Sequence, residues 1–407
     1  MTCLWTCLNS LSAVVLDLNE AIQCALTGSP TIMIANSEAD VQKSEEYQVG
    51  LLPNPIFSVE VDGANSFINK RKGTDRDITY SLSQLFELGG KRAARKRIAA
   101  FESSLALYEL EGVKLDIRND VTWAVVDIVA AQEYIKLADE QQHIADEIYS
   151  STAAKVQGGK VSPLQEKKAN IARITSKLAV EKAIRFLELA KKKLAAICGG
   201  ALPDFTEVSY PLFEIAPLED LNHLIARQCN NLEALKWDMQ IAAGEQIVVS
   251  EKAQRIPDVV VTAGYVQCQD DGDGVLVGLS IPIPIFDRNQ GNICKARQLL
   301  NQLYEKKKEG MLRLRIGLED AYGQLLTAYK EGMAFKEDIL SSAKSAFEAA
   351  KEEYAQGRND YLELLDAQRT LFDVQEQYIN TLVDYHHKKA DVDRLVGTPQ
   401  IKCLVGD

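Results

Sequence analysis

The stretch that decides the fold is "YAQGRNDYLELLDAQ", Tyr354–Gln368. A glycine and a short polar run interrupt a long helical pattern there, and the pattern resumes at once. Glycine readily adopts the positive φ that ends a helix, so Gly357 predicts a helix that stops and turns back. An earlier stretch, "KVQGGKVSPLQEKKAN" (Lys155–Asn170), has the same order of residues around Gly159. We therefore expect two helical hairpins.

The two stretches belong to an internal repeat. Gly159 and Gly357 are 198 residues apart, and other pairs lie at nearly the same offset: Lys160 and Arg358, Leu164 and Leu362, Ala169 and Ala367, Pro55 and Pro257, Gly90 and Gly291. Pairs at an almost constant offset indicate two copies of one unit. We expect repeat 1 over residues 16–215 and repeat 2 over 216–399, after an atypical or truncated signal segment at 1–15 and before a C-terminal tail at 400–407.

Each repeat is predicted to contain a helix, two strands and a long helical hairpin. The strands are expected at about 55–63 and 77–86, then at 258–267 and 274–284, with hairpin tips near 158–163 and 357–361. Apolar side chains alternate with polar ones along these strands; Phe57, Val59 and Val61, for example, alternate with Ser58, Glu60 and Asp62. A soluble half-buried sheet and a membrane β-barrel both show this alternation, so the pattern alone leaves both open.

The helices of the hairpins are unusually long. Residues 93–157 contain no proline, and a helix of this length spans roughly 100 Å. Apolar residues recur at intervals of four and three at Ile117, Val121, Ala124, Ile128, Ala131, Ile135 and Ala138. This spacing is typical of a coiled-coil seam. The predicted fold is therefore mostly α with a small β part, built from long antiparallel coiled helical hairpins.

The composition excludes several classes of function. A net charge of −12 argues against a nucleic-acid partner, because phosphate binding needs a basic surface. No nucleophile–base or metal-ligand pattern is evident, so we expect neither an enzyme, nor a cofactor, nor a bound metal. The eight cysteines form no CxxC pair and are most simply small core or surface residues.

Four further motifs and the two glycine turns carry a family resemblance. They are "LDLNEAIQCAL", "LLPNP", "SLSQLFELGGKRAAR" and "LSIPIPIFDRNQGNICKA". From about Leu16 to Pro399 the chain resembles the TolC-like outer membrane efflux proteins, and "FELGGKR" is similar to the branch that serves heavy-metal efflux pumps.

The resemblance implies a homotrimer in the cell outer membrane that extends into the periplasm. Each chain would give four strands to a twelve-stranded β-barrel in contact with outer membrane lipid, and its hairpins to a periplasmic α-barrel. Such a protein is a passive exit duct, which receives its cargo from an inner-membrane pump through a periplasmic adaptor protein.

The resemblance also implies two sets of site residues. The hairpin tips would contact the adaptor through Gly159, Lys160, Val161, Ser162, Leu164, Gly357, Arg358, Asp360 and Leu362. Glu363 and Asp366 stand where the family carries two aspartates, six and nine residues after the tip glycine. Around a threefold axis they would form acidic rings that constrict and gate the channel. Glu363 has a longer side chain than the aspartate of the family, so the corresponding ring would be shaped differently. The alternative interpretation of Glu363 and Asp366 is that they simply lie on a solvated helix face.

Two other functions remain open at this stage. A soluble coiled-coil scaffold is favoured by the start "MTCLWTCLNSLSAVV", which lacks the basic residues of an ordinary secretion signal. An exit duct of a type I protein secretion system would share the same architecture, so metal, drug and protein all remain candidate cargoes.

Overall fold

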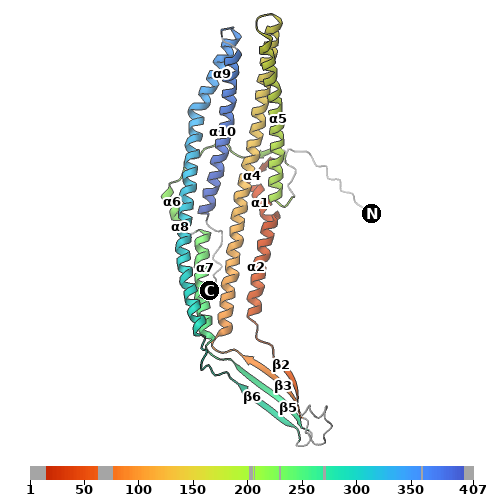
Figure 1. Cartoon of the computed structure of the whole chain (residues 1–407), viewed down its shortest axis with the longest axis vertical. Coiled ribbons are helices and arrows are strands. Elements are labelled where there is room, and N and C mark those ends of the chain that lie inside the picture. Colours follow the sequence, from red (N-terminus) through yellow and green to blue (C-terminus); the bar gives the residue numbers. More distant parts are fainter. Residues whose placement is uncertain are drawn as a thin grey trace, which may run out of the picture. The chain divides into compact units, whose positions relative to one another are not determined.

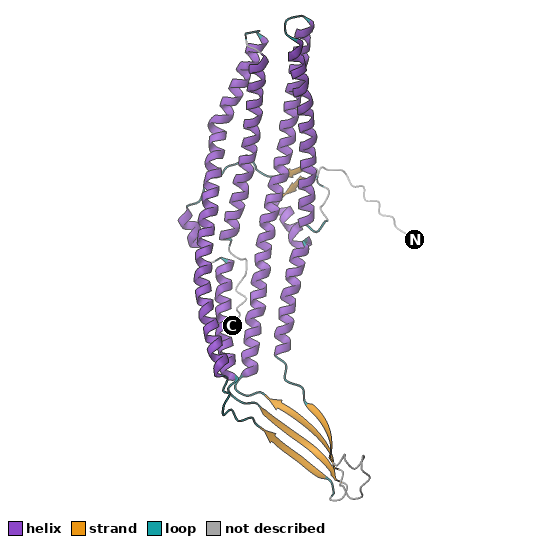
Figure 2. Ribbon diagram, viewed as in Figure 1, coloured by secondary structure: helices purple, strands orange, loops and turns teal. Residues whose placement is uncertain are grey.

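The computed structural model describes residues 15–62, 77–200, 205, 207–228, 231–268, 272–358 and 361–397. The chain is mostly helical, with a small part in strands (Figure 2). It divides into two compact units, and both halves of the sequence contribute to each. We call the described parts of Ala35–Leu110 and Glu233–Met311 the sheet unit. The hairpin unit comprises the described parts of Met1–Ile34, Glu111–Leu232 and Leu312–Asp407.

The sheet unit contains a four-stranded antiparallel sheet in the order β2-β3-β5-β6 (Figure 1). The strands are β2 (Ile56–Asp62), β3 (Asp77–Phe86), β5 (Val259–Cys268) and β6 (Gly274–Ser280). β6 ends before the expected residue 284, because Pro282 and Pro284 have no N–H to donate to a neighbouring strand.

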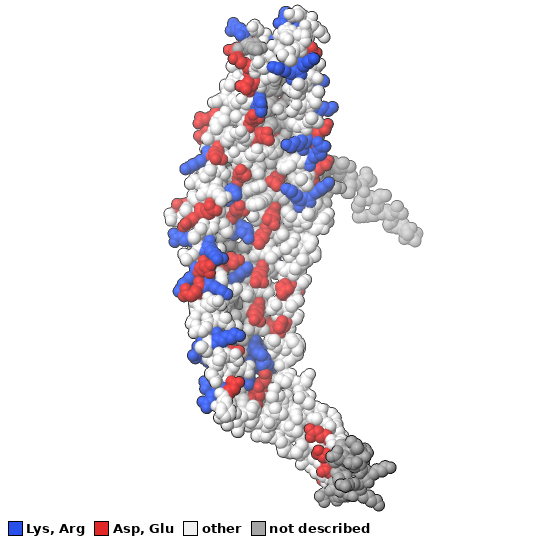
Figure 3. Space-filling view, in the orientation of Figure 1, with Lys and Arg blue, Asp and Glu red and all other residues white. Residues whose placement is uncertain are grey.

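The predicted alternation is confirmed by the register of the strands. Phe57 lies opposite Leu82, Leu82 opposite Ala263, and Ala263 opposite Val277, so one face is apolar across all four strands. The other face carries hydroxyl pairs: Ser58 with Ser81 at 3.2 Å, and Ser83 with Thr262 at 2.9 Å. The apolar face is exposed in the single chain, with Val277 78% exposed. On the side shown in Figure 3 the strands are mostly white, with acidic side chains close to the grey residues.

Ion pairs fix the strand ends to the start of helix α4 (Lys91–Gln157). Lys91 is buried and its Nζ lies 2.8 Å from a carboxylate oxygen of Asp258, just before β5. Arg95 forms a two-pronged pair with Glu87, just after β3. These contacts hold two neighbouring strands against one helix end. The other helices that contribute to this unit are α2 (Pro30–Val49), α7 (Leu232–Ala253) and α8 (Gln290–Ala334).

The hairpin unit contains both predicted hairpins. The first joins α4 to α5 (Pro163–Ile197). In the second, α8 continues through a short π-helix, η1 (Phe335–Ile339), into α9 (Leu340–Ala355), and α10 (Tyr361–Val396) returns. The predicted seam of α4 is buried, with Val121, Ile128 and Ala131 fully inaccessible to solvent. Among the described residues, no helix is both long and apolar enough to span a membrane.

One feature of this unit has no local signature in the sequence. A two-stranded parallel sheet pairs β1 (Val15–Asp17) with β4 (Glu207–Ser209). Its central residues, Leu16 and Val208, are buried. Two short helices, α1 (Leu18–Gly28) and α6 (Leu221–Gln228), complete the unit.

Candidate functional site at the hairpin tips

The outgoing helix of each hairpin ends in the same hydrogen-bonded turn. At the first tip Gly159 has φ 68°, its N–H donates to the Val156 carbonyl, and the Lys160 N–H donates to the Lys155 carbonyl. At the second tip Gly357 has φ 73°, and its N–H and that of Arg358 donate to carbonyls three and five residues back. This is the Schellman pattern, in which a left-handed residue satisfies the last carbonyls of a helix. The glycines therefore end the helices as the sequence predicts.

The returning helices begin differently, as the mismatch between Pro163 and Tyr361 predicts. Ser162 caps α5 by accepting a hydrogen bond from the Leu164 N–H at 3.3 Å, and Pro163 follows as the first helical residue. Tyr361 instead begins α10 with its side chain only 1% exposed. Burial, together with the nearby Tyr354, raises the pKa of Tyr361 to about 12. One tip therefore starts on an exposed proline, and the other on a buried aromatic ring.

Most of the residues expected to contact an adaptor lie on the surface. The exposed members are Gly159, Lys160, Ser162, Leu164, Gly357, Arg358 and Leu362, and Val161 is half-buried. Leu164 is 60% exposed and Leu362 53%, although both are large apolar side chains. Asp360 lies outside the described residues. Each tip therefore carries an exposed leucine within four residues of an exposed cation.

Glu363 and Asp366 lie on the exposed side of the first turns of α10. The opposite side of these turns is buried: Tyr361 and Leu364 belong to an apolar cluster that also contains Phe347 of α9. The cluster fixes the rotation of α10, and both carboxylates consequently point away from the protein core. Asp366 also lines a groove of about 560 Å³, whose other walls come from α4 and α5.

A direct contact between the two hairpins was not foreseen from the sequence. The Tyr354 hydroxyl lies 3.3 Å from Thr152 Oγ1. Lys155 Nζ lies 3.6 Å from the centre of the Tyr354 ring and donates to the Tyr354 carbonyl at 3.2 Å. We call Thr152, Lys155 and Tyr354 the tip latch. Both quoted tip motifs contain a latch residue, but no local pattern shows that these residues meet.

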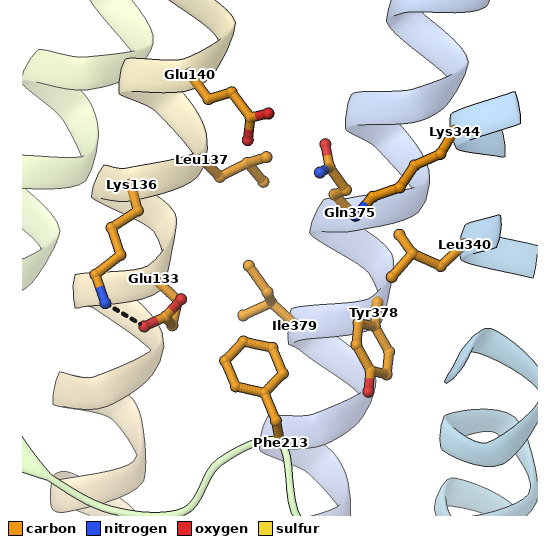
Figure 4. Close-up of a pocket in the computed structure, with 10 residues that line it drawn as sticks. All are labelled: Glu133, Lys136, Leu137, Glu140, Phe213, Leu340, Lys344, Gln375, Tyr378 and Ile379. Carbon is orange, nitrogen blue, oxygen red and sulfur yellow. Dashed lines mark hydrogen bonds and ion pairs between the residues drawn. The ribbon is translucent and has the colours of Figure 1, made fainter. Parts of the chain in front are cut away.

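Farther from the tips the same hairpins are separated by a cavity of about 300 Å³. Figure 4 shows α4 on one side and α10 on the other, with Ile379 and Phe213 between them. Glu133 and Lys136 form an ion pair of 2.7 Å on the α4 side, and Tyr378 lines the cavity from α10. The cavity interrupts this contact only locally, because farther along α10 the hairpins meet again through the Arg394–Asp116 and His387–Asp127 ion pairs.

This architecture is that of outer membrane channel proteins in solved structures. The crystal structure of CusC matches with a TM-score of 0.79 at 14% identity, covering 96% of this chain and 95% of that one. VceC from Vibrio cholerae matches with a TM-score of 0.74 at 16% identity, covering 94% and 96%. At these identities the likeness defines the fold.

The family follows from the sequence itself. The model of the outer membrane efflux protein family matches residues 34–200 and 227–398, and the chain belongs to this family. The cobalt-zinc-cadmium resistance protein CzcC of Cupriavidus metallidurans is 29% identical, over 94% of this chain and 90% of its own. The nickel and cobalt resistance protein CnrC of the same species is 26% identical, over 75% of this chain and 72% of its own.

Membership confirms the predicted class. The protein is an outer membrane efflux channel that extends into the periplasm, and its relatives are efflux channels rather than enzymes. The soluble coiled-coil scaffold is therefore set aside.

Proposed function

We propose that this protein is the trimeric outer membrane exit duct of a three-part pump that expels divalent metal cations. The observation that carries the choice of cargo is the similarity to CzcC along nearly the whole chain, together with the resistance to cobalt, zinc and cadmium in that protein's name. The pump in the inner membrane would supply the energy, and this chain would supply only the passage.

The sheet supports a trimeric barrel. β2 and β6 are the edges of the four-stranded sheet, and within the described residues each is paired with a strand on one side only. Pairing β6 of one copy with β2 of the next would satisfy both edges, and three copies would close a twelve-stranded barrel. The exposed apolar face, which includes Phe57, Leu82 and Val277, would then meet lipid. The hydroxyl-lined face would meet the water-filled lumen.

A twofold repeat accounts for the paired features of the chain. The pairs β2–β3 and β5–β6 each precede a long helical hairpin, and both outgoing helices end in the same glycine turn. Two copies of one unit would supply four similar strands and two tips per chain, as the barrel and the adaptor contact require.

The tips would bind the periplasmic adaptor. The exposed pairs Leu164 with Lys160 and Leu362 with Arg358 offer an apolar contact beside a positive charge at each tip. Asp360 completes the proposed contact set. Because Pro163 and Tyr361 make the two tips unequal, we propose that they bind different parts of the adaptor.

Glu363 and Asp366 would form the gate. Three copies would place six carboxylates around the axis in two rings, since the two residues are three apart on one exposed helix face. Such rings attract cations and hold divalent ions when closed, so the tip helices must move apart for free passage.

Conductance of the full-length protein in a planar lipid bilayer tests this proposal. The wild type should give cation-selective steps that millimolar divalent ions block. Glu363→Gln/Asp366→Asn should weaken the block at least roughly tenfold, because it removes both rings while it keeps their shape. Glu348→Gln/Glu352→Gln is the matched control, since it removes two exposed charges from α9 of the same hairpin.

The outcomes separate the parts of the proposal. Block that persists in Glu363→Gln/Asp366→Asn would disprove the gate but keep the channel. Folded protein that gives no steps would disprove the duct. Cargo is tested separately: deletion of the gene should sensitise cells to cobalt, zinc or cadmium, and unchanged sensitivity would overturn the metal assignment.

A further inference from the structure

The ends of helices α1 and α5 approach one another unusually closely. A Cβ atom on Gly28 would lie 2.6 Å from the Cys198 carbonyl oxygen, and one on Gly199 would lie 2.2 Å from the Gly28 carbonyl oxygen. Both distances are far below contact distance, so only glycine permits this approach. Gly199 also has φ 79°, and its N–H and that of Gly200 cap the end of α5. Two helix ends are thus held together by backbone geometry.

Two cysteines lie at this junction. Cys24 precedes Gly28 by one helical turn, so both residues face the same side of α1. Cys198 is the C-cap of α5 and is 2% exposed. A side-chain hydrogen bond joins the two cysteines, and both belong to the hairpin unit. Two thiols 174 positions apart in the sequence are therefore neighbours in space.

We propose that Cys24 and Cys198 form a disulfide in the cell envelope. The periplasm is an oxidising compartment in which adjacent thiols persist as disulfides. This proposal uses the location of the family but is independent of the cargo, the gate and the trimer.

The chemistry needs one oxidant, the disulfide of a thiol–disulfide oxidoreductase. The half-buried Cys24 attacks it first, gives up its proton and forms a mixed disulfide, while one sulfur of the oxidant leaves as a thiolate. Cys198 then attacks the Cys24 sulfur, loses its proton and releases the second sulfur of the oxidant. The S–S bond forms as two electrons pass to the oxidant, which ends as a dithiol.

The burial of Cys198 makes the second step slow. Burial, followed by the contact with Cys24, raises the pKa of the Cys198 thiol to about 12, so little thiolate is present at neutral pH. The same burial protects the finished bond from reductants. We therefore expect a slowly formed and durable link, which suits a structural disulfide.

The link would fasten the base of the first hairpin. α5 runs from the tip to Cys198, and α1 continues past Ser29 into α2. A bond between α1 and the end of α5 would hold the base of α5 while the tip remains free to move. It would also close a long loop, and long closed loops restrict the unfolded chain most.

Peptide mapping of the full-length protein, isolated from envelopes with its thiols trapped by an alkylating agent, is the direct test. We expect a peptide pair that joins Cys24 to Cys198, with a mass about 2 Da below the sum of the two thiol peptides. Reductant should separate the pair and lower the Tm of the detergent-solubilised protein by roughly 5 °C or more.

Single substitutions provide the controls. Cys24→Ser and Cys198→Ser should each lose the faster migration that the closed loop gives on a non-reducing gel, whereas Cys294→Ser, at an exposed thiol of α8, should keep it. The proposal would be overturned if Cys24 and Cys198 in envelope-derived protein were both alkylated, and if both were still alkylated when the protein had first been incubated with oxidised glutathione. Should a variant fail to fold, wild-type mapping alone decides.

Discussion

The two hairpin tips each turn at a glycine, and glycine is needed there because of its backbone conformation rather than for lack of space. Gly159 and Gly357 have positive φ, yet a Cβ on either would meet nothing within 4 Å. Alanine would fit the space but not the backbone, at a cost of roughly 1–2 kcal/mol per site. Gly357→Ala should therefore lower the Tm and speed amide exchange at the second tip.

Gly317→Ala is the matched control for that prediction. Gly317 lies within α8, where a Cβ also meets nothing within 4 Å and φ is helical. The change should stabilise the protein by roughly 0.5–1 kcal/mol, because alanine favours a helix. Equal effects of the two substitutions would mean that φ does not decide the turn.

A buried histidine gives stability a pH dependence of known sign. His386 Nε2 lies 2.9 Å from the Leu212 carbonyl and must donate to it, so in the neutral ring Nδ1 accepts from the Tyr210 hydroxyl at 3.0 Å. Burial, and then the charges of Lys389 and His387, lower the pKa of His386 below its ordinary 6.5, whereas the Leu212 hydrogen bond opposes the shift. As the pH falls, the unfolded chain therefore protonates His386 before the folded chain does.

The contribution of neutral His386 to the free energy of unfolding should be fully present above pH 6.5. It should decline as the pH falls below 6.5, by at most about 1.4 kcal/mol per pH unit. His386→Gln should flatten the dependence of Tm on pH between 7 and 5. His143→Gln, at an exposed position on α4, should leave it unchanged. A slope that survives in His386→Gln would assign the effect to other titrating groups.

At the scale of elements, the tip latch joins the two hairpins. Lys155 contributes a cation–π contact and a hydrogen bond to Tyr354, together worth on the order of 1–2 kcal/mol. Lys155→Met should remove both and raise the fraction of time that the channel is open in a bilayer. Lys168→Met, at an exposed site on α5, should leave this fraction unchanged. An unaltered fraction in Lys155→Met would show that the latch does not restrain opening.

The elements differ in how far their sequence predicts them. The hairpins and the strands follow from local signals: a glycine turn, a heptad seam and an alternation of period two. β1 and β4 escaped prediction because three-residue strands carry too little pattern. The exposure of Glu363 follows from the buried spacing of Tyr361 and Leu364, which is local. The latch and the cysteine pair depend on packing between distant segments, and no single stretch encodes them.

At the scale of the whole molecule, the single chain leaves apolar surface that assembly would cover. Ile171, Ile174 and Leu178 recur at three and four along α5, and each is at least half exposed, Ile171 by 65%. A helix stripe of this kind normally packs on another helix. In the proposed trimer, α5 of one copy would pack on a helix of the next.

Ile174→Lys/Leu178→Lys should therefore convert the purified trimer to smaller species, because each of the three interfaces would bury two charges without partners. Native mass spectrometry in detergent measures the outcome. Glu348→Lys/Glu352→Lys provides the control: it places two lysines at exposed positions of α9 instead of on the α5 stripe. A trimer that tolerates Ile174→Lys/Leu178→Lys would place the interface on another helix. If the wild-type protein were monomeric, the acidic rings could not form and the proposed gate would be wrong.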